Sequence, residues 1–212
     1  MVRSDECSLE AVVGRALQQR RLALALAESC TGGLVSHRIT NVPGISAVYL
    51  GGVVSYADEV KVSILGVQPS TLARHGAVSE PVAREMAQGV RQLLGADVAL
   101  SITGIAGPGG GSAEKPVGLV FIGLATPQGV RVEQHEWAGD REANKRYSAD
   151  AALDLLRRYL ESGERRVGGW YQSLRMATVD CSDAADLFLN LNTPQDLAAA
   201  SSGGDKPPTA VN

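Results

Sequence analysis

The chain has 212 residues, of which 44% are hydrophobic, and its formal net charge is −3 with a sequence pI of about 5.6. This length can bury one sizeable core and a small appendage, and the lack of a basic stripe or of basic loops studded with aromatic residues argues against a nucleic-acid partner. The first ten residues contain no apolar core and no apolar run approaches about 18 residues, so neither a signal peptide nor a membrane span is predicted, and a cytoplasmic location is expected. The three cysteines, Cys7, Cys30 and Cys181, are odd in number and widely spaced, which argues against a disulfide framework and against a zinc site.

Helices and strands alternate along the first 160 residues. In chain order, the spacing of apolar residues and the positions of turn residues predict a helix at 9–20, a strand at 22–28, a helix at 33–39, a strand at 48–56, helices at 58–65 and 79–94, strands at 97–102, 117–125 and 130–137, and a helix at 142–160. Asp58 and Ser79 are expected to be N-caps. The strands at 117–125 and 130–137 are separated by a short turn and should pair as a hairpin. This order predicts an α/β fold, a three-layer α/β/α sandwich with a mixed sheet of about five strands.

Two regions of different composition are predicted. Residues 1–163 carry the periodic pattern and should form the folded domain, whereas residues 164–212 have scattered apolar residues and end in SSGGDKPPTAVN. A segment of that composition offers little surface for a core. Residues 164–212 are therefore expected to be a poorly ordered C-terminal extension.

The stretch 22–33, LALALAESCTGG, predicts a buried strand followed by a turn into a helix. Ser29 stands at the end of the strand and is a candidate nucleophile, although a serine in this position is more often a simple helix cap. Thr31 could cap the helix, and the N–H groups of Gly32 and Gly33 could bind an oxyanion or a phosphate. Cys30 is a rival nucleophile, but no histidine lies near it in the sequence.

A serine nucleophile needs a base, and the three histidines form no recognisable pattern with an acid. Lys61 shares an apolar helical face, where partial desolvation would favour its basic form; the alternative is a lysine whose stem merely covers that face. Tyr56 precedes it by five residues and could relay a proton or stack on a ring, or it could serve only in packing.

The glycine-rich stretch 104–111 has neither the Lys-Ser/Thr pair of a Walker A loop nor a following helix. It could form an anion-binding loop or a lid, with Thr103 and Gly104 facing the ligand, or it could be only a flexible connection. Arg141, just before the last predicted helix, could pair with a phosphate, although a surface arginine there needs no function.

Several of these motifs together resemble the CinA C-terminal domain, the nicotinamide mononucleotide deamidase family. The blocks that carry the resemblance, in the order of that family, are ESCTGG at 28–33, GGVVSYADEVK at 51–61, HGAVSEPVAREMA at 75–87, TGIAGPGGGSAEKPVG at 103–118 and GDRE at 139–142. The resemblance implies the three-layer fold and an amidohydrolase that converts nicotinamide mononucleotide to nicotinate mononucleotide and ammonia.

The same resemblance implies that Ser29, Tyr56 and Lys61 act together. The expected reaction uses no metal or other cofactor, and the expected partners are a small-molecule nucleotide substrate and a second copy of the chain in a homo-oligomer, a dimer. Relatives commonly have a second arginine about four positions after the one that matches Arg141, and here that position is Lys145. Some relatives carry this domain beside a pyrophosphatase domain. The alternative function is therefore a non-catalytic nucleotide-binding or oligomerising module of a competence-inducible or damage-inducible protein.

Overall fold

The computed structural model describes residues 8–162, and the expected extension at 164–212 lies outside them. The elements are α1 (Leu9–Arg20), β1 (Leu24–Glu28), α2 (Leu34–Thr40), the 3-10 turn η2 (Ile45–Ala47), β2 (Tyr49–Val54), α3 (Asp58–Ser63), α4 (Pro69–His75), α5 (Glu80–Leu94), β3 (Val98–Gly104), β4 (Leu119–Thr126), β5 (Gly129–Glu136) and α6 (Arg141–Glu161). Every predicted helix and strand is present. The prediction missed η2 and α4.

The sheet has five strands in the order β2-β1-β3-β4-β5. β1 lies parallel to β2 and to β3, whereas β3 with β4 and β4 with β5 pair antiparallel. The predicted hairpin and the mixed five-stranded sheet are therefore confirmed.

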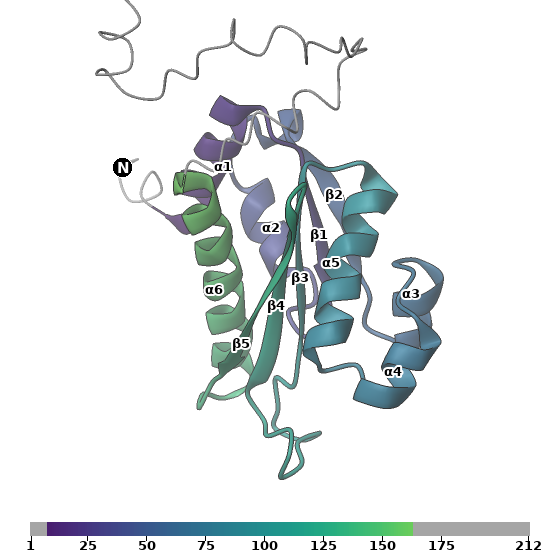
Figure 1. Ribbon diagram of the computed structural model, residues 1–212. Helices are drawn as coiled ribbons and strands as arrows, with labels where there is room; N and C mark the ends of the chain where they lie inside the picture. The colour runs from purple at the N-terminus through teal and green to yellow at the C-terminus, as the bar shows by residue number, and fades with distance from the viewer. Residues whose placement is uncertain (1–7, 163–212) are drawn as a thin grey trace, which may run out of the picture. The chain divides into compact units, whose positions relative to one another are not determined.

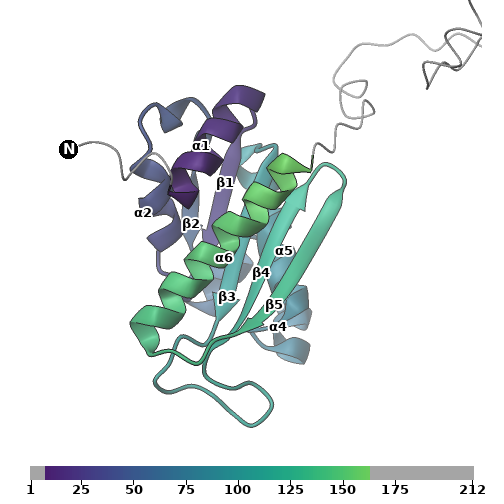
Figure 2. The same ribbon diagram turned by 90° about the vertical axis from the view of Figure 1, so that its left-hand side faces the viewer.

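Helices cover both faces of this sheet. α1, α2 and α6 lie on one face, and α5 lies on the other, with α3 and α4 beside it (Figure 1). The view turned by 90° shows α6 running along its face of the sheet (Figure 2). Each face has its own apolar core, one including Leu17, Ile39, Leu100 and Leu156, and the other including Val82, Met86 and Val90 of α5. This is the three-layer α/β/α arrangement.

Local capping explains where several helices begin. Ser8 accepts a hydrogen bond from the N–H of Ala11 at the start of α1, and Asp140 accepts one from Ala143 at the start of α6. Ser79 does precede α5, but its hydroxyl donates to the carbonyl of Gly76 instead of capping the helix. Ser79 therefore occupies the predicted N-cap position, but its side chain does not make the capping hydrogen bond.

The topology brings distant parts of the chain to one edge of the sheet. Because β1, β2 and β3 run parallel, their carboxyl ends meet there, and α6 begins beside the loop that follows β3. None of the helices in residues 8–162 is long and apolar enough to cross a membrane.

Candidate active site

A cavity of about 290 Å³ lies at the carboxyl ends of β1 and β3. Six of the nine predicted site residues line it: Ser29, Tyr56, Lys61, Thr103, Gly104 and Arg141. They come from four separate segments of the chain. The other three, Thr31, Gly32 and Gly33, are not among its lining residues.

Two backbone hydrogen bonds, one through its N–H and one through its carbonyl, fix the position of Ser29. Its N–H donates to the carbonyl of Ile102 on β3 at 2.9 Å, and its own carbonyl accepts the N–H of Gly32 at 3.0 Å. The side chain is largely buried and lines the cavity. The end of β1 therefore holds the hydroxyl at the cavity wall, as a nucleophile requires.

The N-terminus of α2 binds a carboxylate of this chain. Glu28 is 1% exposed and accepts hydrogen bonds from the N–H groups of Gly33 (3.0 Å), Val35 (3.1 Å) and Ser36 (2.8 Å), and from the Ser36 hydroxyl (2.7 Å). Gly33 reaches this geometry with a φ of +94°, which favours glycine. The N–H of Gly33 thus already donates to Glu28, so a bound anion would have to compete with that carboxylate.

The helix cap predicted at Thr31 is wrong. The N-cap position of α2 is Gly33, and the capping carboxylate comes from Glu28, five residues earlier. Thr31 is buried, and its hydroxyl makes no hydrogen bond within the described part of the chain.

Lys61 is the one buried residue of α3, with 1% of its surface exposed. Its Nζ donates to the carbonyl oxygen of Ser55 at 2.9 Å, to Oδ1 of Asp58 at 3.2 Å and to the carbonyl oxygen of Tyr56 at 3.4 Å.

The sequence predicted Asp58 as the N-cap of this helix. Instead it is the first helical residue, Ala57 is the N-cap, and the Asp58 carboxylate contacts Lys61.

Tyr56 and Arg141 meet at the rim of the cavity. Arg141 donates through Nη2 to the Tyr56 hydroxyl at 3.1 Å and through Nη1 to the carbonyl of Gly107 at 2.6 Å. Tyr56 is 62% exposed, so the alternative that it serves only in core packing is wrong. A guanidinium has five N–H donors, so Arg141 keeps donors for a ligand.

The glycine-rich loop is fastened at both of its sides. Asn144, a buried residue of α6, donates to the carbonyl of Ala106 at 3.1 Å, and Lys115 donates to that of Val78 at 2.8 Å. Thr103, at the start of the loop, donates to the carbonyl of Ala77 at 2.9 Å. These hydrogen bonds fix the loop in place as one wall of the cavity. Nothing in the sequence indicated that Asn144 contributes to this.

A second cavity of about 600 Å³ adjoins the first and shares Ala106 and Arg141 with it. Lys145 lines this second cavity, together with Asp140 and Glu142. Lys145, at the position where the family resemblance leads one to expect a second arginine, therefore lines a cavity next to the candidate site.

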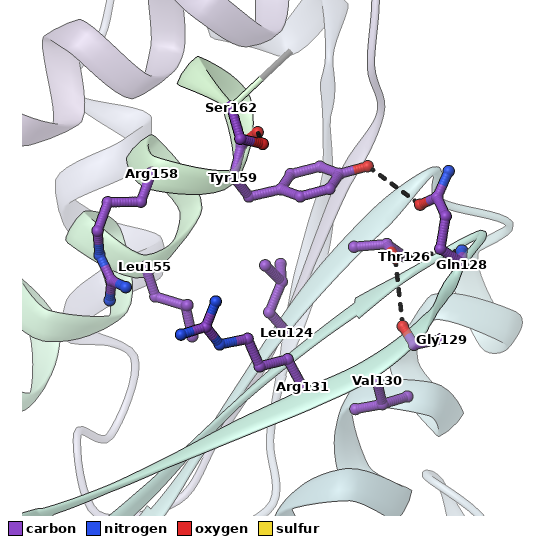
Figure 3. Close-up of a pocket in the computed structure, with 10 residues that line it drawn as sticks. All are labelled: Leu124, Thr126, Gln128, Gly129, Val130, Arg131, Leu155, Arg158, Tyr159 and Ser162. Atoms are coloured by element: carbon purple, nitrogen blue, oxygen red, sulfur yellow. Dashed lines mark hydrogen bonds between the residues drawn. The ribbon is translucent and has the colours of Figure 1, made fainter. Parts of the chain in front are cut away.

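A further cavity, of about 420 Å³, lies between the turn of the β4–β5 hairpin and the end of α6 (Figure 3). No predicted site residue lines it. Its two arginines, Arg131 and Arg158, are each paired with Glu133, and Tyr159 contacts Gln128.

Cys30 also lines the candidate site, and burial raises the pKa of its thiol to about 12. A raised thiol pKa means that the neutral form persists at every pH below about 12, so at pH 8 only about one thiol in ten thousand is a thiolate. We expect iodoacetamide at pH 8 to leave Cys30 of the folded protein unmodified, as judged by peptide mass spectrometry. Unfolded protein should be modified readily, and fast alkylation of the folded form would contradict this account.

Known proteins are similar to this chain over the whole region that contains the site residues. The family model of the CinA C-terminal domain matches residues 6–160. The chain belongs to this family. It is 54% identical over 159 residues to a putative competence-damage inducible protein of Moorella thermoacetica, an alignment that covers 75% of this chain and 38% of that relative. It is 52% identical over 164 residues to a CinA-like protein of Chlorobaculum tepidum, covering 74% and 39%. This chain thus spans about two fifths of the length of these relatives.

Solved structures agree with the family assignment. A CinA superfamily protein from Klebsiella pneumoniae 700603 has a TM-score of 0.70 at 37% identity, covering 73% of this chain and 96% of that one. The competence/damage inducible protein CihA from Agrobacterium tumefaciens has a TM-score of 0.69 at 37% identity, covering 76% and 98%. The α/β fold described above is that of the CinA superfamily.

Proposed function

We propose that this CinA C-terminal domain hydrolyses the carboxamide of nicotinamide mononucleotide to give nicotinate mononucleotide and ammonia, with Ser29 as nucleophile and Lys61 as base. The observation that carries the proposal is the convergence of Ser29, Tyr56, Lys61 and Arg141 on one cavity. The sequence predicts all four as site residues, and they come from three segments of the chain, the outermost of which, at Ser29 and Arg141, are more than 100 residues apart.

The chemistry follows from the groups that line the cavity. Ser29 Oγ attacks the carboxamide carbon, the neutral amine of Lys61 takes the hydroxyl proton, and the same proton passes to the departing nitrogen, which leaves as ammonia. Water then attacks the resulting ester and releases the carboxylate product and the free serine. The step needs no oxidant or reductant.

The cavity also suits the rest of the substrate. Arg141 presents a guanidinium to the first cavity and to the adjoining one, and Lys145 adds a second cation there. Both cations can bind phosphate, Arg141 through paired N–H groups and Lys145 as a point charge. A mononucleotide thus has a place for its carboxamide at Ser29 and for its phosphate beside α6.

The alternative is a non-catalytic nucleotide-binding or oligomerising module. The names of the relatives, competence-damage inducible proteins, fit either function. A module of that kind needs an anion site but no buried lysine near a serine. The presence of both Ser29 and Lys61 in the lining of one cavity is therefore what favours the enzyme.

The proposal predicts discrimination between phosphorylated and unphosphorylated substrates. Ammonia release should have a kcat/KM at least about a hundredfold higher for nicotinamide mononucleotide than for its riboside or for free nicotinamide, because charge-assisted bonds to the phosphate are lost. Arg141→Ala should raise KM for the mononucleotide and leave the slow reaction of free nicotinamide much less affected. Comparable rates on free nicotinamide and on the mononucleotide would contradict the assignment of Arg141 to the phosphate.

A further inference from the structure

The backbone between α4 and α5 is held in place by side chains from elsewhere in the chain. Each of the four carbonyl groups at 75–78 accepts a hydrogen bond from a side chain: Ser79 and Thr103 each supply one, and Lys115 supplies the other two. A backbone carbonyl outside regular structure needs such a partner when it is withdrawn from water. The position of this segment therefore depends strongly on Lys115.

The two bonds from Lys115 run to the carbonyl oxygens of His75, at 2.5 Å, and Val78, at 2.8 Å. His75 is the last residue of α4, where a cation is favourable because the final carbonyls of a helix lack partners within it. Hydrogen bonds from an ammonium group are roughly twice as strong as those between neutral groups. A single side chain thus binds this segment at two points.

Lys115 itself belongs to the loop that joins β3 to β4, which extends beyond the end of the sheet (Figure 2). A turn fixes its backbone, because the N–H of Ser112 donates to the Lys115 carbonyl at 2.8 Å and the N–H of Lys115 donates to the Ser112 hydroxyl at 3.1 Å. Among residues 105–118, Lys115 is the one side chain that hydrogen-bonds to the segment 75–78 in the described structure.

Both of the segments that Lys115 joins line the candidate active site. Ala77 and Val78 form part of its wall on one side, and the glycine-rich stretch at 104–110 forms part of it on the other. Arg141 and Asn144 of α6 hold the near side of that stretch, at the carbonyls of residues 107 and 106. Lys115 ties the far side of the loop across to the segment 75–78, although it does not line the cavity.

We infer that Lys115 is a positioning residue that holds the glycine-rich loop against the segment 75–78 and so sets the shape of the cavity in which the mononucleotide binds. The identity of the ligand rests on the proposed function, whereas the contacts of Lys115 do not. Ser29 and Lys61 are held by separate hydrogen bonds, to Ile102 and to Ser55. Loss of Lys115 should therefore weaken substrate binding and leave the chemical step largely intact.

The kinetic test compares Lys115→Met, Lys115→Arg and Arg74→Met. Methionine keeps an unbranched stem but has no donor, arginine keeps donors for both carbonyls, and Arg74 is an exposed residue of α4 that makes no ion pair in the described structure. Lys115→Met should raise KM for nicotinamide mononucleotide about tenfold and change kcat by no more than about threefold. Its melting temperature should change by no more than about 2 °C, since a surface loop can open without unfolding the sheet.

Lys115→Arg should restore most of the wild-type KM, and Arg74→Met should match the wild type. An unchanged KM in Lys115→Met, or a fall confined to kcat, would overturn the inference. So would an equal rise of KM in Arg74→Met, because it would show that the loss of a positive charge, and not the loss of the two hydrogen bonds, weakens binding.

A second readout needs no substrate. Amide hydrogen exchange followed by mass spectrometry should be at least about tenfold faster in Lys115→Met for peptides that cover 75–79 and 104–118, and unchanged for those that cover β1. Unchanged exchange at 75–79 and 104–118 would overturn the inference. Faster exchange there in a protein that releases no ammonia would support the role of Lys115 and overturn the proposed function.

Discussion

Lys61→Arg is expected to lower kcat/KM for nicotinamide mononucleotide by about a thousandfold or more. Arginine keeps the positive charge and much of the length of lysine, but it does not give up a proton in a protein, so it cannot serve as the base. Ser29→Ala should cause a loss of similar size. The double variant should be about as inactive as either single one, because residues that act as a unit are strongly non-additive.

Folding has to be separated from chemistry in this comparison, since Lys61 is buried and arginine is larger. Circular dichroism and the melting temperature identify a misfolded Lys61→Arg protein, and Ser29→Ala tests the same dyad with a smaller side chain. Cys30→Ala is the matched control beside Ser29, and it should keep most of the activity. Substantial activity in folded Lys61→Arg would show that another group is the base.

Glu28→Gln is expected to have the largest effect on stability. The carboxylate takes two hydrogen bonds on each oxygen, from the N–H groups of Gly33 and Val35 on Oε2 and from the N–H and hydroxyl of Ser36 on Oε1. An amide keeps the shape, but its NH₂ group must face either the N–H groups of Gly33 and Val35 or the N–H of Ser36 beside a hydroxyl that can turn to accept. At least one buried N–H donor loses its acceptor and the remaining bonds lose their charge, which should cost roughly 3 kcal/mol and lower the melting temperature by about 6–12 °C.

The matched control is Glu136→Gln. Glu136 is an exposed residue at the end of β5 and makes no ion pair in the described structure, so the same change of charge should shift the melting temperature by no more than about 2 °C. A melting temperature of Glu28→Gln equal to that of Glu136→Gln would show that the carboxylate is not what holds the start of α2.

The fold was predictable because its strands and long helices have clear local patterns. The apolar run that becomes β1 ends where residues change to small and hydroxylated types, and α5 has a strong apolar stripe that ends at Gly95, a residue in the left-handed conformation. The missed helix α4 has no buried residue, so it offers no apolar periodicity, although Pro69 at its first turn was a signal of a helix start.

The site was only partly predictable. Ser29 and Lys61 could be proposed as a pair only through the family resemblance, because nothing in their spacing indicates that the end of β1 and the start of α3 line the same cavity. Glu28 was visible as the one charge in an apolar strand, but its role depends on the turn at Gly33, which aims the N–H groups of α2 back at it. The sequence predicts Asp58 as a helix cap, but α3 begins at Asp58 with Ala57 as its N-cap, and the Asp58 carboxylate pairs with Lys61, three residues further along the same helix.

The central claim is that this domain releases ammonia from nicotinamide mononucleotide at Ser29. The most direct test is to incubate the wild-type protein, Ser29→Ala and Cys30→Ala with the mononucleotide and to measure ammonia and nicotinate mononucleotide together. The account predicts that wild type and Cys30→Ala form the two products in equal amounts and that Ser29→Ala forms neither. Binding of the mononucleotide by the wild type, seen as a raised melting temperature, without any ammonia would contradict the account and favour the non-catalytic module.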